Sequence, residues 1–68
     1  MTLTVAIEQD DDGRWIAEVL ELPGVLTYGQ SPAEAPAKVQ ALARRVVADR
    51  LDHGEAGPDL VRMAFAAA

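Results

Sequence analysis

The chain has 68 residues, a net charge of −5 at pH 7, 50% hydrophobic residues, a single histidine and no cysteine. A chain this short forms one domain, residues 1–68, and buries only about 60% of the surface that its unfolded form exposes. Small domains gain the missing stability from disulfides, metals or oligomerisation. Without cysteine, we expect a homo-oligomer or a complex with a partner protein.

The acidic composition argues against direct binding to nucleic acid, because that affinity comes largely from Lys and Arg side chains that neutralise phosphates. No apolar run approaches the roughly 20 residues needed to cross a bilayer. The first residues also lack the basic segment that opens a signal peptide. We therefore expect a cytoplasmic protein that binds neither nucleic acid nor membrane and that is suited to a basic protein partner.

The first part of the chain predicts a β-hairpin. Apolar and polar residues alternate from Thr2 to Gln9 and again from Arg14 to Leu20. The intervening loop, Asp11-Asp12-Gly13, suits a type I turn closed by a bulge at the glycine. In the register that this loop favours, Ile7 lies opposite Ala17, so the apolar sides of both strands share one face.

The tripeptide Leu22-Pro23-Gly24 interrupts the strand pattern. Proline donates no hydrogen bond to a sheet, and glycine favours a turn. We expect the chain to reverse here and to return as a short strand from Val25 to Tyr28, antiparallel to the second strand and ended by Gly29.

A helix start follows at Ser31, which is the expected N-cap, with Pro32 at the first helical position and Glu34 completing a capping box. Pro36 lies one turn further on, where a proline removes a backbone hydrogen bond and crowds the preceding turn. We therefore expect a kink or a loosened start of the helix.

Apolar residues then recur at three- and four-residue spacing and predict a helical stripe that packs on the sheet. This stripe contains Ala35, Val39, Leu42, Val46 and Leu51. The helix should end near His53, with Gly54 as a left-handed cap. After a loop at 55–59, a last strand is expected from Leu60 to Ala66. The predicted fold is a two-layer α+β domain of order βββαβ, with one helix packed on a small mixed sheet.

Candidate catalytic and metal-binding residues have simpler structural explanations. Asp10, Asp11 and Asp12 are consecutive in an exposed turn and point in different directions, whereas a two-metal site needs carboxylates that converge from separate elements. His53 lies at a helix end without a positioned nucleophile, and no glycine-rich phosphate loop is present. We expect no enzymatic activity, no metal and no cofactor.

The second face of the sheet is partly apolar, and an uncovered apolar patch often marks an interaction surface. The candidate partner surface combines this face with the acidic turn and contains Asp10, Asp11, Asp12, Ile16, Glu18 and Leu20. The alternative is that scattered apolar residues on the surface of so small a domain have no partner.

The stretch GRWIAEVLELPGVLTYGQSPAEA resembles the HicB-like antitoxin family. Its recurring features are a glycine-led second strand, a Leu-Pro-Gly turn, a short strand closed by glycine, and a polar cap with a Glu-Ala pair that opens a helix. The matching positions are Gly13, Trp15, Ala17, Leu22, Pro23, Gly24, Gly29, Ser31, Glu34 and Ala35.

The resemblance implies a βββαβ fold comparable to a degraded ribonuclease H core, and dimers or higher oligomers. It also implies neutralisation, by direct binding, of a small basic HicA-type toxin that cleaves messenger RNA. Two features depart from the family: Pro36 replaces a large aliphatic residue, and we expect no C-terminal DNA-binding domain in residues 1–68. These departures favour an alternative, a stand-alone oligomeric HicB-like domain with a structural or unknown regulatory role.

Overall fold

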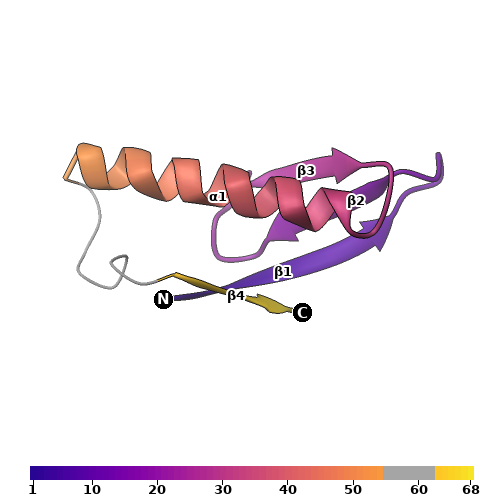
Figure 1. The fold of residues 1–68 in the computed structure, drawn as a ribbon, viewed down its shortest axis with the longest axis horizontal. Helices are drawn as coiled ribbons and strands as arrows, with labels where there is room; N and C mark the ends of the chain where they lie inside the picture. Colours follow the sequence, from indigo (N-terminus) through magenta and orange to yellow (C-terminus); the bar gives the residue numbers. More distant parts are fainter. Residues whose placement is uncertain (55–62) are drawn as a thin grey trace.

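The computed structural model describes residues 1–54 and 63–68. Its elements in chain order are β1 (Thr2–Gln9), β2 (Trp15–Val19), β3 (Leu26–Gly29), α1 (Glu34–Asp52) and β4 (Ala64–Ala67). The strands form one sheet in the order β3-β2-β1-β4, with β4 parallel to β1 and the other pairs antiparallel. The helix lies along one face of this sheet (Figure 1). The expected α+β class, with one helix packed on a mixed sheet, is confirmed.

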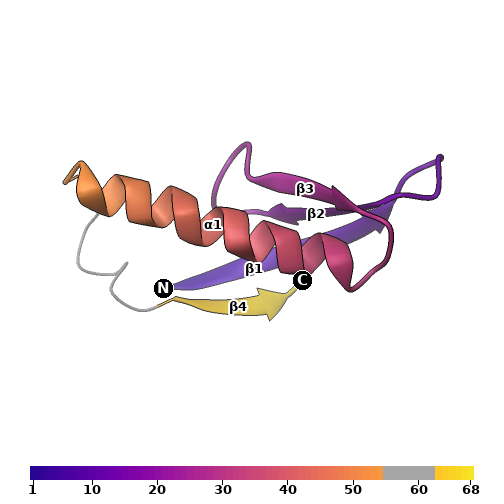
Figure 2. The ribbon, with the colours of Figure 1, turned by 45° about the horizontal axis from the view of Figure 1, so that its top comes forward.

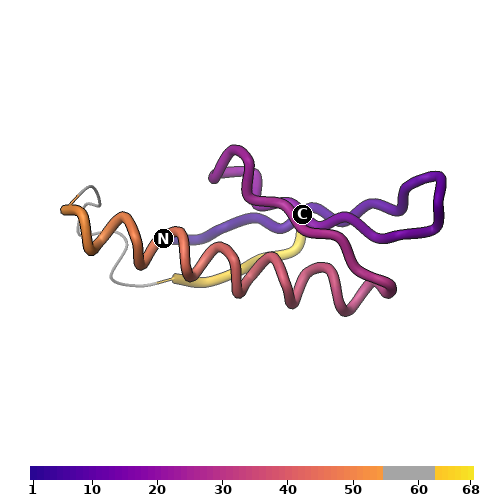
Figure 3. Tube along the Cα trace, turned by 90° about the horizontal axis from the view of Figure 1, so that it is seen from above, coloured from indigo at the N-terminus to yellow at the C-terminus, as the bar shows by residue number. Residues whose placement is uncertain are grey.

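The hairpin of β1 and β2 has the expected register. Ile7 pairs with Ala17 and Val5 pairs with Val19. Gly13 has φ of 84° and donates its N–H to the carbonyl of Asp10 at 3.1 Å, which is the backbone geometry expected for the bulge position. Figure 3 shows that the hairpin tip reaches beyond the start of α1.

The chain reverses at the Pro23-Gly24 pair as expected. The Val25 N–H donates to the Leu22 carbonyl at 3.0 Å, and Gly24 has φ of 85°, so this is a type II turn. The side chain of Leu22 is buried in the core, which strand alternation did not indicate. The third strand runs from Leu26 to Gly29, one residue later at each end than the predicted Val25 to Tyr28, so Gly29 is its last residue.

The helix begins at Glu34, two residues later than Pro32, the predicted first position. The N-cap position is Ala33 and not Ser31 as predicted, and the Ala33 side chain makes no cap hydrogen bond. Ser31 supplies that bond from two residues earlier, because its hydroxyl accepts the N–H of Glu34 at 3.0 Å.

The backbone N–H groups on either side of Pro36 make long hydrogen bonds: Ala35 donates to the carbonyl of Ser31 and Ala37 to that of Ala33, each at 3.4 Å. The usual distance is ~2.9–3.0 Å, so the expected loosened start is confirmed. Pro36 is tolerated because the first N–H groups of a helix have no intrahelical partner.

The core lies between α1 and the inner face of the sheet. Among the described residues, its buried members are Leu3, Val5, Ala17, Val19, Leu22, Val25, Ala35, Val39, Ala43 and Val47. The helix thus buries every fourth residue, and the predicted stripe was wrong in part. Leu42 and Val46 only flank the core, whereas Leu51 is 45% exposed near the end of α1 that reaches past the start of β1 (Figure 1).

The helix ends as predicted, with His53 as its C-cap and Gly54 at φ of 67°. The expected loop at 55–59 and the first part of the expected last strand, residues 60–62, lie outside the described residues. Met63, the next predicted strand residue, is not in a strand. The strand β4 covers Ala64–Ala67, ends one residue beyond the predicted end and lies beside β1 (Figure 2).

A close approach between β3 and α1 requires glycine at position 29. A Cβ atom built there would lie 2.6 Å from the backbone nitrogen of Ala35 and 3.1 Å from the Ala35 side chain. A backbone nitrogen cannot rotate away as a side-chain tip can. The start of α1 therefore sits directly against the backbone of β3.

We predict that Gly29→Ala lowers the free energy of unfolding by about 1–3 kcal/mol, because the added methyl group overpacks the contact between strand and helix. Denaturant titration measures the loss. The matched control is Gln30→Ala, at the exposed neighbouring position, which should change stability by no more than about 0.5 kcal/mol. Equal stability of the Gly29→Ala variant and the wild type would contradict the prediction.

Candidate protein-interaction surface

The face of the sheet opposite α1 is covered by none of the helices and strands in the described residues. Side chains alternate between the two faces of a strand, so the neighbours of the core residues point to this second face. We call it the outer sheet face and define it by Thr4, Ala6, Glu8, Ile16, Glu18, Leu20, Leu26, Tyr28, Ala64 and Ala66. Leu20 is 53% exposed and Tyr28 45% exposed.

Strand pairing places carboxylates among apolar side chains on the outer sheet face. One row across the sheet contains Glu8, Ile16 and Tyr28, and the next contains Ala6, Glu18 and Leu26. Opposed side chains of neighbouring strands are close enough to interact. The surface therefore presents apolar area together with negative charge, which suits a partner that carries both apolar and basic groups.

Glu21 joins the end of β2 to β1 at one margin of this face. Its carboxylate accepts both the backbone N–H and the hydroxyl of Thr4, each at 2.7 Å. These two hydrogen bonds favour the ionised form and hold the pKa of Glu21 below its usual value. This exposed carboxylate therefore serves as a structural clamp.

We predict that Glu21 contributes to a decrease in stability as the solution becomes acidic. Its pKa is lower in the folded than in the unfolded state, so its contribution is present above the unfolded pKa and is lost as pH falls through the folded pKa. Urea titrations between neutral and acidic pH measure this dependence. The dependence should be weaker in Glu21→Gln and retained in Glu18→Gln, which leaves the contacts of Thr4 intact. An unchanged profile in Glu21→Gln would contradict the assignment.

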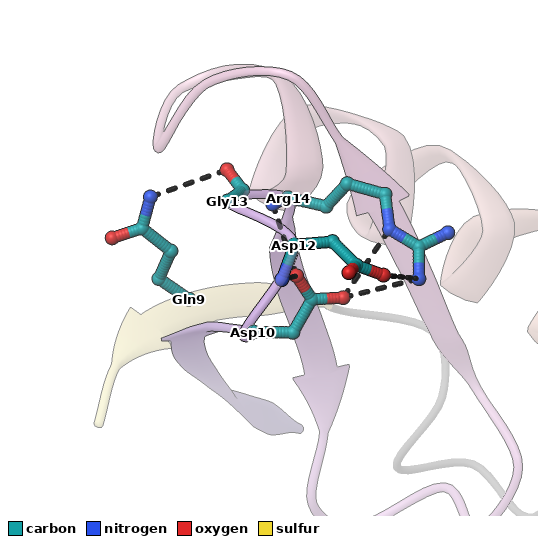
Figure 4. A network of polar contacts seen from close by, with 5 residues as sticks. All are labelled: Gln9, Asp10, Asp12, Gly13 and Arg14. Atoms are coloured by element: carbon teal, nitrogen blue, oxygen red, sulfur yellow. Dashed lines mark hydrogen bonds and ion pairs between the residues drawn. The ribbon is translucent and has the colours of Figure 1, made fainter.

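At the acidic hairpin tip, the carboxylates of Asp10 and Asp12 interact with groups of the same loop (Figure 4). One oxygen of Asp10 accepts the backbone N–H groups of Asp12 and Arg14, each at 3.0 Å, and the other accepts the Arg14 side chain. The Arg14 guanidinium also lies 3.6 Å from a carboxylate oxygen of Asp12 and 4.6 Å from the ring centre of Tyr28. Gln9 closes the loop by donating to the Gly13 carbonyl at 3.2 Å.

The residues predicted as a partner surface therefore occupy two places. Ile16, Glu18 and Leu20 share the outer sheet face, whereas the three aspartates lie in the turn between β1 and β2, of which Figure 4 shows Asp10 and Asp12. Arg14 stands between the two groups, held by Asp10 and stacked on Tyr28. Exposed negative charge therefore lies in both places, on Glu8 and Glu18 of the sheet and on Asp11 and Asp12 of the hairpin tip, where the Asp12 side chain is 78% exposed.

We predict that Asp10 stabilises the hairpin and that Asp11 does not. Asp10→Ala should lower the free energy of unfolding by about 1–2 kcal/mol, because two backbone N–H groups and the Arg14 side chain lose a charged acceptor. Asp11→Ala removes the same charge from an exposed position and should alter stability by no more than about 0.5 kcal/mol. Thermal and urea denaturation distinguish the two variants, and equal losses would contradict the role of Asp10.

The residues that could suggest catalysis have structural partners. The ring nitrogen Nδ1 of His53 lies 2.8 Å from the backbone carbonyl of Asp49, so the histidine closes the end of α1. The Ser31 hydroxyl caps the start of the same helix. Within residues 1–54 and 63–68, no three His, Cys, Asp or Glu side chains are grouped to hold a metal ion. In the same residues, α1 is too polar to cross a membrane.

Glu8, Tyr28 and Glu21 belong to the candidate surface but were missing from the predicted set. Strand alternation and the hairpin register already place Glu8 beside Ile16, and the same alternation in the third strand places Tyr28 on that face. The contact of Glu21 with Thr4 has no comparable signal, because Glu21 follows the end of its strand.

Comparison with known proteins finds no matching family model, no matching curated protein and no matching solved structure. The likeness to the HicB-like family therefore rests on the sequence signature alone.

Proposed function

We propose that the chain is a non-catalytic, antitoxin-like protein that binds and neutralises a small basic toxin of the HicA type, which cleaves RNA. The observation that carries this proposal is the outer sheet face, where exposed apolar residues surround carboxylates and no described element covers them. A protein that neutralises another by masking it needs such a surface and needs no catalytic group.

Charge supports a basic partner. The chain has a net charge of −5, and the outer sheet face holds Glu8 and Glu18. Arg14, which lies over Tyr28 of that face, is engaged by Asp10 and Asp12. Complementary charge accelerates association and selects among partners, and apolar area supplies much of the affinity. Binding of this kind should weaken as salt screens the exposed charges.

The order of elements also supports the proposal. Three strands, a helix and a strand are the order that the resemblance to HicB-like antitoxins implies. Three glycines of the signature shape this fold. Gly13 closes the hairpin, Gly24 reverses the chain, and Gly29 allows the start of the helix to pack against β3. The residues that carry the resemblance thus shape the scaffold, and the outer sheet face is left to make contacts.

The test is neutralisation of a small basic RNA-cleaving protein encoded beside this chain. We expect co-expression to relieve the growth arrest that such a protein causes, and the purified chain to inhibit its RNA cleavage. Glu18→Lys should weaken binding by about tenfold or more, because it places a like charge opposite a basic partner. Isothermal titration calorimetry at several salt concentrations measures the effect.

The matched control is Asp52→Lys, which makes the same change of charge at an exposed position of α1, away from the outer sheet face. It should bind and protect nearly as well as the wild type. Equal weakening by both variants would show that total charge matters and the outer sheet face does not. A neighbouring basic toxin that the chain fails to bind would overturn the proposed function.

The second candidate is a stand-alone oligomeric domain without a toxin. The observation that favours it is β4, whose second edge is unpaired within the described residues. A chain that assembles with itself, and has no small basic protein encoded beside it, would fit this candidate better.

A further inference from the structure

Within residues 1–54 and 63–68, the outward edge of β4 presents backbone groups that pair with no other strand. Ala64 donates its N–H to the carbonyl of Met1, and Ala68 donates to the carbonyl of Val5, each at 3.0 Å. Backbone groups of successive strand residues point to opposite edges, so Phe65 and Ala67 direct their N–H and C=O groups away from β1. No strand in the described residues pairs with this edge.

In the part of the chain that the structure describes, β4 carries none of the devices that prevent sheets from joining. Natural proteins protect edge strands with charged side chains, prolines or bulges, but β4 reads Ala-Phe-Ala-Ala. Among the described residues, the Arg44 guanidinium contacts this strand and lies 5.2 Å from the ring centre of Phe65. Although the chain has a net charge of −5, β4 itself carries no carboxylate side chain that would face a second copy.

A shallow hollow lies beside the same edge on the side of α1. It has a volume of about 110 Å³ and is lined in part by Ile7, Pro36, Phe65 and Ala67. Ile7 is 44% exposed although it shares a face with the buried Val5. The edge therefore combines free backbone hydrogen-bonding groups with adjacent apolar surface, the combination used when one chain adds a strand to the sheet of another.

We propose that two copies of this chain pair through β4 in an antiparallel, twofold-symmetric arrangement. With Ala66 opposite its equivalent on the axis, Phe65 faces Ala67 of the second copy, and each such pair exchanges both of its N–H···O=C bonds. A large side chain thus faces a small one across the interface. The arrangement is self-complementary, as a twofold interface must be.

The pairing joins the two sheets into one without using the outer sheet face. Residues that oppose each other in an antiparallel pair point to the same side of the sheet, so both helices lie on one side and both outer sheet faces on the other. The dimer would therefore present two copies of the candidate interaction surface side by side. The inference does not depend on the identity of any toxin.

The first experiment compares two proline variants by sedimentation equilibrium and light scattering. The wild type should form a dimer, at twice the chain mass of 7.2 kDa. Ala67→Pro removes an N–H that points to the free edge, and should weaken the dimer by about tenfold or more, because both copies lose a hydrogen bond. Ala68→Pro is the matched control, since its N–H bonds to Val5 within the chain; the dimer should persist in this variant. Circular dichroism verifies that each variant is folded.

The second experiment tests the register by disulfide formation in variants that keep all the backbone N–H groups of β4. Because the chain has no natural cysteine, only the introduced thiols can form the disulfide. Ala66→Cys places two thiols opposite each other in a non-hydrogen-bonded pair, where Cα atoms are about 4.5 Å apart and a disulfide is allowed. Mild oxidation should give a covalent dimer. Ala67→Cys should remain uncrosslinked, because each thiol faces Phe65 of the other copy.

A wild type that stays monomeric at all concentrations overturns the proposal. So does a dimer that tolerates Ala67→Pro as well as Ala68→Pro, or one that crosslinks through Ala67→Cys and not through Ala66→Cys. A dimer that dissociates with Ala67→Pro and crosslinks through Ala66→Cys establishes the pairing.

Discussion

The close packing of the start of α1 on β3 is the constraint on which the rest of the structure depends. The backbone nitrogen of Ala35 approaches Gly29 so closely that a Cβ there would lie 2.6 Å away. Thr27 reinforces the contact by donating its hydroxyl hydrogen to the carbonyl of Ala35 at 2.8 Å. The first turn of the helix, capped by Ser31, is thereby held at one side of the sheet.

This position determines which surfaces remain open. A single helix cannot cover both faces of a sheet, so none of the described helices and strands covers the outer sheet face. Because α1 is held against β3, a hollow also remains on the inner face beside β4, where Ile7 and Phe65 are incompletely buried. The buried core residues in residues 1–54 and 63–68 are aliphatic and mostly small, as a close approach of helix and sheet requires. The two open surfaces follow from the same packing that forms the core.

Much of the fold could be predicted because its signals are local. Gly13 and Gly24 mark turns whose backbone requires positive φ, and the hairpin loop sets the register that places Ile16 and Glu18 on one face. The helix face was predicted less well, because three- and four-residue spacing allows neighbouring stripes. Only packing on the sheet selected Ala43 and Val47 over Leu42 and Val46 for full burial.

The sequence by itself determined the order of the elements, the two turns, the register of the hairpin and the cap at Ser31. Each of these depends on backbone conformations within a few residues. Tertiary structure alone decided that Glu21 clamps Thr4, that Arg14 stacks on Tyr28, and that β4 lies parallel to β1 with a free edge. These features join residues distant in sequence, and no local pattern specifies which distant groups will meet once a helix and a sheet pack together.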